Sequence, residues 1–203
     1  MKCEFIPIDI QNEFATEGGK FYSPKPSIKF LNEVLFPYFK EYGIKTNEII
    51  SDYRQPRPGD SGDGCCPGEW GYKSLIPDDL RKSLWVKCMN SPIWIRENIG
   101  IKDKEPGVPY PDSNAFEKWI KQNVGQPDEV RPVLFGLTID CCVLSAIQEF
   151  RWRGYRPIVI REAVDHASGK EEDKSIVLEK TAISWWAEIV NWDEFTKKYL
   201  GQP

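Results

Sequence analysis

Three polar features follow apolar stretches of the sequence, at points where strands are expected to end. Asp9 closes the run FIPID, Cys142 follows VLFGLTIDC, and Lys102 and Lys104 follow IWIRENIGI. Because ligands of open α/β sheets bind at the carboxyl ends of the strands, these residues can meet in one crevice. A carboxylate near a thiol can take its proton, and a lysine beside the carboxylate keeps it charged. The pattern is compatible with a nucleophilic Cys142 and Asp9 as its base.

Cys142 stands where an expected strand passes into an expected helix. Backbone N–H groups and the dipole at a helix start lower the pKa of a thiol and can hold an oxyanion. Structural explanations exist as well: a cysteine at a strand end is often packing, a strand-end aspartate often caps a loop, and loop lysines are mostly solvated. Residue types and order alone leave both interpretations open.

Alternating strand-like and helix-like segments must position these residues. Expected strands cover residues 5–8, 48–52, 92–101, 131–137, 156–160 and 187–190. Expected helices cover residues 26–42, 77–89, 113–124, 143–153, 170–186 and 192–200. Strands separated by helices imply parallel pairing with right-handed crossovers. We therefore expect a three-layer α/β/α fold with a doubly wound, mainly parallel, Rossmann-like sheet, in one domain over residues 1–203.

Composition narrows the possible partners and the compartment. The chain has 203 residues, 29% of them charged, and a formal net charge of −4. Lys and Arg are scattered without a basic stripe, so we expect no nucleic-acid partner. No apolar run approaches the ~18 residues of a membrane span, so we expect no membrane association. The N-terminus reads as a strand interrupted by Asp9, without a signal-peptide cleavage site, which predicts a cytoplasmic protein.

The cysteines and the single histidine limit metal chemistry. Six cysteines, including the vicinal pairs Cys65–Cys66 and Cys141–Cys142, make a poor disulfide framework. The sequence has no CxxC pair, and His166 is its one histidine. A site with several histidine ligands is thereby excluded, and we expect reduced thiols and no bound metal.

Five segments agree in order and spacing with one known pattern. IDIQNEF (8–14) is similar to D-x-Q-N-x-F, CCPGEWG (65–71) to C-x-x-G-x-x-G, SNAF (113–116) to S-x-A-F, and GLTIDCCV (136–143) to G-x-x-x-D-x-C-V, followed by a GY-containing helix and strand (145–165). Together they resemble the isochorismatase-like hydrolases, which include nicotinamidases, N-carbamoylsarcosine amidohydrolases, and biuret and ureidoacrylate hydrolases.

The resemblance implies roles for matching residues. Asp9 is the general base, and Cys142 is the nucleophile. The N–H groups of Thr138 and Cys142 form the oxyanion hole, and the peptide bond between Leu137 and Thr138 is expected to be cis. Phe14 lines the substrate pocket.

The family also uses a lysine before the S-x-A-F helix. Lys102 fits this position best and Lys104 next. Lys87 follows another apolar run, LWV, but that run falls in the segment predicted as helix.

One region departs from the nicotinamidases, which carry D-x-H and two further histidines as metal ligands. Asp52 is retained, but Arg54 stands at the histidine position, and Ser61 follows the PGD of residues 58–60 where a second histidine is expected. Cys65 or Cys66 stands near the last ligand position. One carboxylate and a thiol do not make that site, which argues against a metal and against nicotinamide as substrate.

Several other side chains are candidates for substrate contact. Arg54 can bind a carboxylate or carbonyl of a substrate, although a structural ion pair explains it equally well. Trp70, together with Tyr72 and Tyr110, is a candidate pocket wall. His166 is expected to be an exposed or locally hydrogen-bonded loop residue, with a place at the crevice mouth as the alternative. The tryptophans at positions 185, 186 and 192 suit core packing or a subunit interface, and we expect a homo-oligomer.

These expectations combine into one function. The chain is predicted to be a cysteine amidohydrolase that cleaves a C–N bond of a small amide or ureido compound through a thioester, without a cofactor. The main alternative is a non-catalytic or redox-responsive member in which Cys141 and Cys142 respond to oxidation. Cleavage of a vinyl ether is disfavoured by Cys142, and nucleotide binding by the lack of a glycine-rich turn after the first strand.

Overall fold

The computed structural model describes residues 1–59 and 62–201 of the chain. Six strands form one sheet in the order β3-β2-β1-β6-β7-β8, and all neighbouring pairs are parallel. They are β1 (Lys2–Ile8), β2 (Thr46–Ser51), β3 (Arg81–Lys87), β6 (Val130–Leu137), β7 (Ile158–Asp165) and β8 (Glu188–Val190). The strand order reverses between β1 and β6, and the carboxyl ends at such a switch point flank the crevice where ligands bind.

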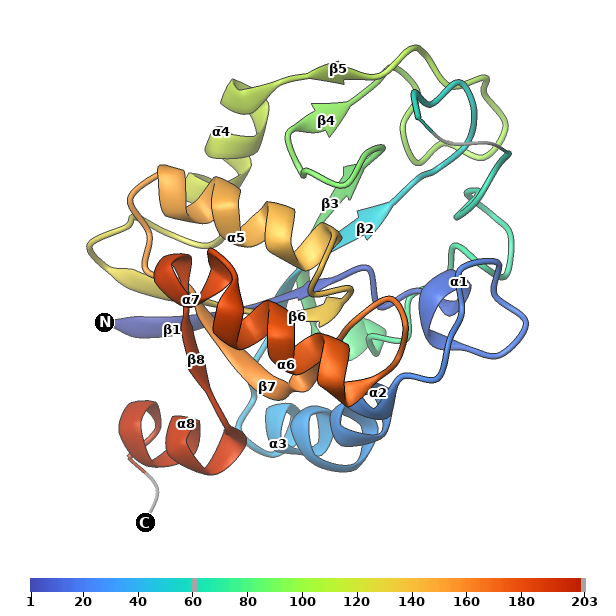
Figure 1. The fold of residues 1–203 in the computed structure, drawn as a ribbon. Helices are drawn as coiled ribbons and strands as arrows, with labels where there is room; N and C mark the ends of the chain where they lie inside the picture. The colour runs from blue at the N-terminus through green and yellow to red at the C-terminus, as the bar shows by residue number, and fades with distance from the viewer. Residues whose placement is uncertain (60–61, 202–203) are drawn as a thin grey trace.

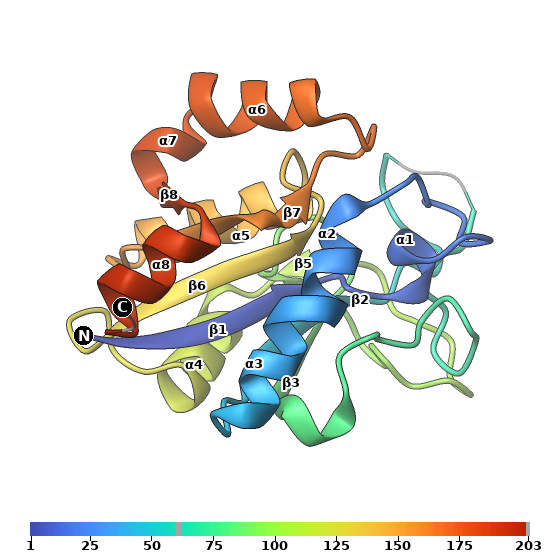
Figure 2. The ribbon, with the colours of Figure 1, turned by 90° about the horizontal axis from the view of Figure 1, so that it is seen from below.

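Helices cover both faces of the sheet and make three layers (Figures 1 and 2). One face carries α2 (Pro26–Phe30), α3 (Phe36–Glu41) and α8 (Trp192–Tyr199), and the other carries α4 (Ser113–Asn123) and α5 (Cys142–Trp152). The remaining helical elements are α1 (Asn12–Ala15), the π turn η1 (Leu31–Leu35), the 3-10 turn η2 (Asp78–Leu80), α6 (Glu171–Lys180) and α7 (Ile183–Trp186). The predicted three-layer, doubly wound α/β fold is confirmed.

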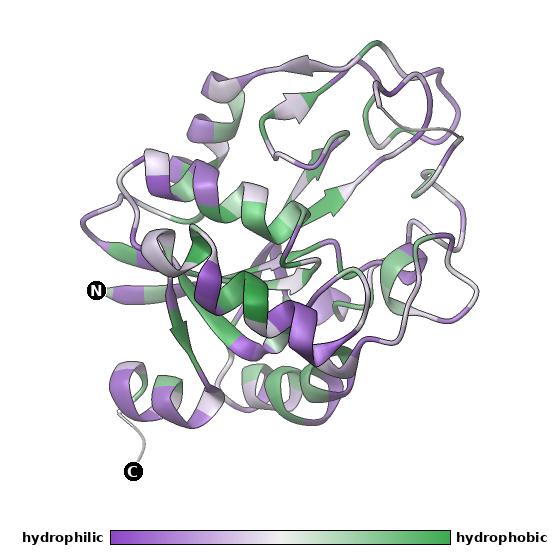
Figure 3. Ribbon diagram, in the orientation of Figure 1, coloured by the Kyte–Doolittle hydropathy of each residue, from purple (hydrophilic) through white to green (hydrophobic). Residues whose placement is uncertain are grey.

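Aromatic side chains pack the layers together. Phe5 of β1 lies 4.6 Å from Phe39 of α3 and 5.8 Å from Phe195 of α8, measured between ring centroids. On the other face, Phe116 of α4 packs edge-on against Phe150 of α5 at 6.0 Å. Figure 3 shows hydrophobic residues concentrated along the strands and polar residues on the outer turns of the helices. The segments FIPI of β1 and VLFGL of β6 are apolar and buried, as expected of strands covered on both faces, which is why these two strands could be located from the sequence.

The prediction of a helix over residues 77–89 is wrong. The segment forms η2 and then β3, an edge strand that pairs in parallel with β2. Leu80, Leu84, Trp85 and Cys88 have helical spacing in the sequence, but the side chains of RKSLWVK alternate between more and less exposed positions for much of the strand. An edge strand with one solvated side lacks the continuous apolar run of a central strand, so its pattern is ambiguous.

Three other predicted elements differ in detail. Residues 92–101 are mostly loop, with only β4 (Trp94–Ile95) pairing in antiparallel fashion with β5 (Tyr110–Pro111). The helix expected over residues 26–42 contains the π turn η1, which ends at Leu35, two residues before Pro37, and Pro37 lacks the N–H that continues an α-helix. The helix expected over residues 170–186 is divided into α6 and α7. Within the described ranges, no helix has the length and apolar character required to traverse a bilayer.

Candidate active site

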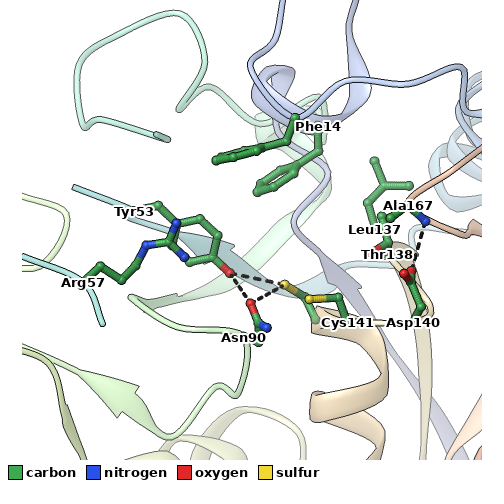
Figure 4. A pocket seen from close by; sticks show the side chains of 11 residues that line it. Phe14, Tyr53, Arg57, Asn90, Leu137, Thr138, Asp140, Cys141 and Ala167 are labelled. Carbon is green, nitrogen blue, oxygen red and sulfur yellow. Dashed lines mark hydrogen bonds between the residues drawn. The ribbon is translucent and has the colours of Figure 1, made fainter. Parts of the chain in front are cut away.

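A cavity of about 270 Å³ opens at the carboxyl edge of the sheet, at the switch point between β1 and β6. Its walls combine aromatic rings with a few polar groups and the N-terminal end of α5 (Figure 4). The lining residues are Phe14, Phe21, Tyr53, Arg57, Asn90, Leu137, Thr138, Asp140, Cys141, Cys142 and Ala167. A small, mostly apolar hollow with a few convergent polar groups is the usual form of a small-molecule site.

Asp9 and Lys87 form a fully buried ion pair beneath this cavity. Lys87 Nζ donates to Asp9 Oδ2 at 2.8 Å, and both side chains have an exposed fraction of 0%. Ser51 lies between them: Lys87 Nζ donates to its Oγ at 2.7 Å, and this hydroxyl donates to Asp9 Oδ1 at 2.9 Å. Asp9 follows β1, while Ser51 and Lys87 end β2 and β3, so three neighbouring strands deliver the cluster.

Cys142, the first residue of α5, faces the same lysine. Its Sγ lies 3.4 Å from Lys87 Nζ and 3.3 Å from the Tyr53 hydroxyl, and its thiol donates to Asn90 Oδ1 at 3.8 Å. The hydrogen bonds of the described residues do not include one between Asp9 and Cys142. The structure thus brings the predicted base and nucleophile together through Lys87, which contacts both.

Burial and close neighbours shift the pKa values of this cluster. Burial alone lowers the pKa of Lys87, but the Asp9 carboxylate and the Cys142 sulfur outweigh it and hold that pKa well above its usual value. The hydrogen bond with Cys141 and burial raise the pKa of Cys142, against the effect of Lys87. In the resting site, the hydrogen bond with Cys141 and burial therefore leave the pKa of this thiol above its usual value, in spite of its place at the helix start.

The turn before α5 has the predicted backbone geometry. The peptide bond between Leu137 and Thr138 is cis. The Thr138 carbonyl accepts from the N–H groups of Cys141 and Val143, each at 3.1 Å. Neither bond uses the N–H of Thr138 or of Cys142, the two groups predicted to form an oxyanion hole, and both residues line the cavity.

The expectation that Lys102 lies beside Asp9 is wrong. Lys102 is exposed, its side chain passes beside Gly68, and together with Lys104 it lines a separate, polar cavity of about 810 Å³. Lys87 takes the predicted position because residues 81–87 are a strand, which places Lys87 at the carboxyl edge of the sheet. The sequence signal was the apolar run LWV directly before this lysine.

Arg54, predicted to contact substrate, instead belongs to an ion cluster around Asp52. Its Nε and Nη2 donate to the two oxygens of Asp52 at 3.0 and 2.7 Å, and Arg96 Nη2 donates to Asp52 Oδ1 at 3.0 Å. Arg54 lines the separate polar cavity and not the one beside Cys142. Asp52 is the carboxylate that aligns with the nicotinamidase metal site, and the guanidinium groups of Arg54 and Arg96 already bind both of its oxygens. Asp52 therefore does not fit a metal cation.

No group of three or more His, Cys, Asp or Glu side chains in the described ranges is arranged to hold a metal ion. Asp60 and Ser61, which were aligned with the metal-binding segment, lie outside the described residues.

The remaining candidates divide between the cavity and the surface. Phe14 lines the cavity as predicted and stacks on Phe21 at 5.4 Å. Trp70 does not line it: its side chain is 46% exposed, while its carbonyl accepts from Asn12 Nδ2. His166 Nε2 lies 3.3 Å from Oδ2 of the lining residue Asp140.

Sequence reasoning missed four polar lining residues, Tyr53, Arg57, Asn90 and Asp140. Tyr53 directly follows Asp52 at the end of β2, and Asn90 comes three residues after Lys87. Tyr53 and Asn90 could have been found from their positions just beyond the carboxyl end of a strand. For Asn90, this required the correct boundary of β3.

Comparisons with known proteins identify the fold. No family model and no curated protein matches the sequence. Among solved structures, an isochorismatase-like hydrolase from Alkaliphilus metalliredigens matches 97% of this chain and 98% of its own, with a TM-score of 0.68 and 17% identity. The pyrazinamidase of Pyrococcus horikoshii, solved in complex with zinc, covers 95% of this chain and 100% of its own, with a TM-score of 0.64 and 19% identity.

An N-carbamoylsarcosine amidase from Thermoplasma acidophilum also matches, over 94% of this chain and 96% of its own, with a TM-score of 0.59 and 18% identity. The chain therefore has the fold of the isochorismatase-like hydrolases, as its sequence motifs predicted.

Proposed function

We propose that this chain is a cysteine amidohydrolase of the isochorismatase-like superfamily. It cleaves a C–N bond of a small amide or ureido compound through a thioester on Cys142, in one domain over residues 1–203. One observation carries the proposal: Lys87 Nζ lies 2.8 Å from Asp9 Oδ2 and 3.4 Å from Cys142 Sγ, at a cavity with space for a small molecule. The amide-hydrolysing proteins with the same fold support the reaction class.

The first chemical step is proton removal and attack. Because the resting thiol is neutral, its proton must leave before the sulfur, then an anion, attacks the carbonyl carbon. Lys87 passes one proton to Asp9 while it accepts the thiol proton, so the lysine remains charged and Asp9 becomes neutral. The oxyanion then rests on the N–H groups of Thr138 and Cys142.

The second half of the reaction returns the site to its starting state. Asp9 gives its proton to the leaving nitrogen, the C–N bond breaks, and a thioester remains on Cys142. A water molecule, which loses a proton to the same carboxylate, attacks the thioester and releases the acid. The proton then returns to the sulfur, so no cofactor takes part.

Ammonia release from a panel of small amides tests the proposal. The panel contains nicotinamide, biuret, N-carbamoyl amino acids and ureidoacrylate analogues, and Cys142→Ala is measured beside the wild type. We expect turnover of at least one compound and its loss by several orders of magnitude in the variant. Cys3→Ala, at the opposite end of β1, is the matched control and should retain turnover. Equal turnover by Cys142→Ala and wild type contradicts the assignment.

A redox-responsive protein is the second candidate, and one observation favours it. The hydrogen bond between the vicinal thiols lowers the pKa of Cys141 while it raises that of Cys142. Reversible formation of a Cys141–Cys142 disulfide or a sulfenate by peroxide, without turnover of any amide, would support this function in place of hydrolysis.

We also propose that the chain assembles with copies of itself. Trp152 is 67% exposed on α5 and Trp185 is 84% exposed on α7, which lies against α5. Exposed tryptophans are enriched at protein interfaces. Light scattering coupled to size-exclusion chromatography tests this, and a monomer at every concentration contradicts it.

A further inference from the structure

Tyr53 places a buried phenol against the nucleophilic sulfur. Its side chain is only 3% exposed, and its hydroxyl lies 3.0 Å from Lys87 Nζ and 3.3 Å from Cys142 Sγ. Figure 4 shows the Tyr53 hydroxyl directed toward Asn90 and toward the cysteine sulfur atoms at the start of α5. No step proposed above uses this hydroxyl.

The ring of Tyr53 is held in one orientation by its neighbours. The guanidinium carbon of Arg57 lies 3.9 Å from the ring centroid, and Phe14 packs edge-on at 6.1 Å. These contacts leave the ring little freedom to turn the hydroxyl away from the sulfur, because a displaced ring would lose packing on both sides.

The hydrogen-bond roles follow from the chemistry of the three partners. The charged Lys87 is only a donor, so the Tyr53 oxygen accepts from it and must direct its own O–H elsewhere. The alternatives within reach are Asn90 Oδ1, at 3.4 Å, and the sulfur of Cys142. While the thiol carries its proton, that proton is donated to Asn90. Once the proton leaves, the sulfur becomes the strongest acceptor near Tyr53.

Burial also keeps the phenol protonated. Burial, and next the nearby Cys142, raise the pKa of Tyr53 well above its usual value, against the effect of Lys87. The hydroxyl therefore keeps its proton, and remains able to donate, at neutral pH.

We propose that Tyr53 is a further catalytic residue, whose hydroxyl donates a hydrogen bond to the anionic sulfur of Cys142 and directs it toward the carbonyl carbon. The inference rests on the proposed cysteine hydrolase. No bond of Tyr53 breaks: its hydrogen bond passes from Asn90 to the sulfur when the thiol loses its proton, and returns to Asn90 when the S–C bond forms.

The test is the pH dependence of Cys142 alkylation in Tyr53→Phe. Iodoacetamide is used, whose iodide is displaced by the sulfur anion, and peptide fragmentation separates Cys142 from Cys141. Loss of one hydrogen bond to a charged group should raise the apparent pKa of the thiol by roughly one to two units. On an amide substrate, kcat should fall about tenfold or more and KM should change little.

Tyr155→Phe is the matched control. Tyr155 is also buried, and its hydroxyl donates to the Gly125 carbonyl at 2.5 Å, outside the cavity. Its loss should lower stability without moving the alkylation profile. An unchanged profile in a folded Tyr53→Phe protein overturns the inference.

A second measurement keeps the inference testable where Tyr53→Phe does not fold. Replacement of tyrosine by 3-fluorotyrosine makes each phenol a stronger donor and should move the alkylation profile toward lower pH. No movement, or movement toward higher pH, contradicts the inference. Because alkylation needs no amide, a failed substrate panel with a shifted profile refutes only the hydrolase, whereas turnover with an unshifted profile refutes only the role of Tyr53.

Discussion

Asp9 and Asp52 are two buried carboxylates that follow neighbouring strands, and their surroundings differ in one respect. Each is paired with a fully buried cation, Lys87 for Asp9 and Arg96 for Asp52. At Asp52, Arg54 and the N–H of Gly100 occupy the remaining acceptor positions. The lysine at Asp9 instead reaches further, to the sulfur of Cys142 and the hydroxyl of Tyr53.

The difference separates a structural ion cluster from a chemical one. Around Asp52, the guanidinium groups also donate to main-chain carbonyls: Arg96 to Asp52, Arg54 and Pro56, and Arg54 to Asn98 and Lys104. This cluster ties the loop after β2 to the loop around Gly100. Around Asp9, the hydrogen bonds lead to Cys142, the proposed nucleophile, at a cavity wall. Lys87 also donates to one main-chain carbonyl, that of Met89, so what distinguishes the two clusters is that, among the described residues, only the cation of Asp9 contacts a thiol.

The largest difference between Asp9 and Asp52 is expected in their effect on turnover. Asp9→Asn removes the proposed proton acceptor but retains the shape of the side chain, and we expect kcat to fall about 10²–10⁴-fold. The matched control is Asp78→Asn, whose side chain is 95% exposed and should leave kcat unchanged. Steady-state kinetics on the folded variants measures both, and wild-type turnover by Asp9→Asn removes the distinction between the two carboxylates.

Asp52 is expected to contribute to the stability of the fold. Asp52→Asn leaves two guanidinium groups without their anion, and we expect a loss of about 3–5 kcal/mol in the free energy of unfolding. Urea denaturation gives the value. The fraction that remains folded should alkylate Cys142 at the wild-type rate, because Asp52 is not in contact with the sulfur. Loss of alkylation without loss of stability contradicts the structural role.

At acid pH, the Asp52 cluster should have a smaller effect on the free energy of unfolding. Although burial opposes it, the hydrogen bonds from Arg54 and the Gly100 N–H hold the pKa of Asp52 below its usual value. A depressed carboxyl pKa contributes stability that is fully present above the unfolded pKa of about 3.9 and is lost as the pH falls through the folded pKa. The acid limb of the unfolding free energy below about pH 4 should therefore be less steep in Asp52→Asn than in wild type.

The smallest effect is expected at the exposed lysine. Lys102→Ala should change the free energy of unfolding by less than about 0.5 kcal/mol and turnover by less than about twofold, as for other surface substitutions. Lys87→Ala is its counterpart and should abolish turnover. If Lys102→Ala lowered turnover more than Lys87→Ala, the proposed catalytic lysine would instead be the one in the loop after residue 101.

The sequence by itself placed Asp9 and Cys142 correctly at the carboxyl edge of the sheet. Asp9 directly follows β1, and Cys142 begins α5 shortly after the end of β6. The carboxyl-terminal halves of both strands are apolar because they are covered on both faces, so the end of each strand could be located. The fold class followed from the same alternation of apolar strands and amphipathic helices. Phe14 was located by the family motif that contains Asp9, and the structure places it in the cavity wall.

Only the tertiary structure decided which lysine joins Asp9 and which side chains face the sulfur. β3 lies two strands from β1, a distance of about 9–10 Å at the usual spacing, and a long lysine side chain can cross the intervening strand beside Ser51. Tyr53 and Asn90 likewise meet Cys142 from the loops after β2 and β3. Such contacts depend on strand order and strand boundaries, which local periodicity does not specify at an edge strand.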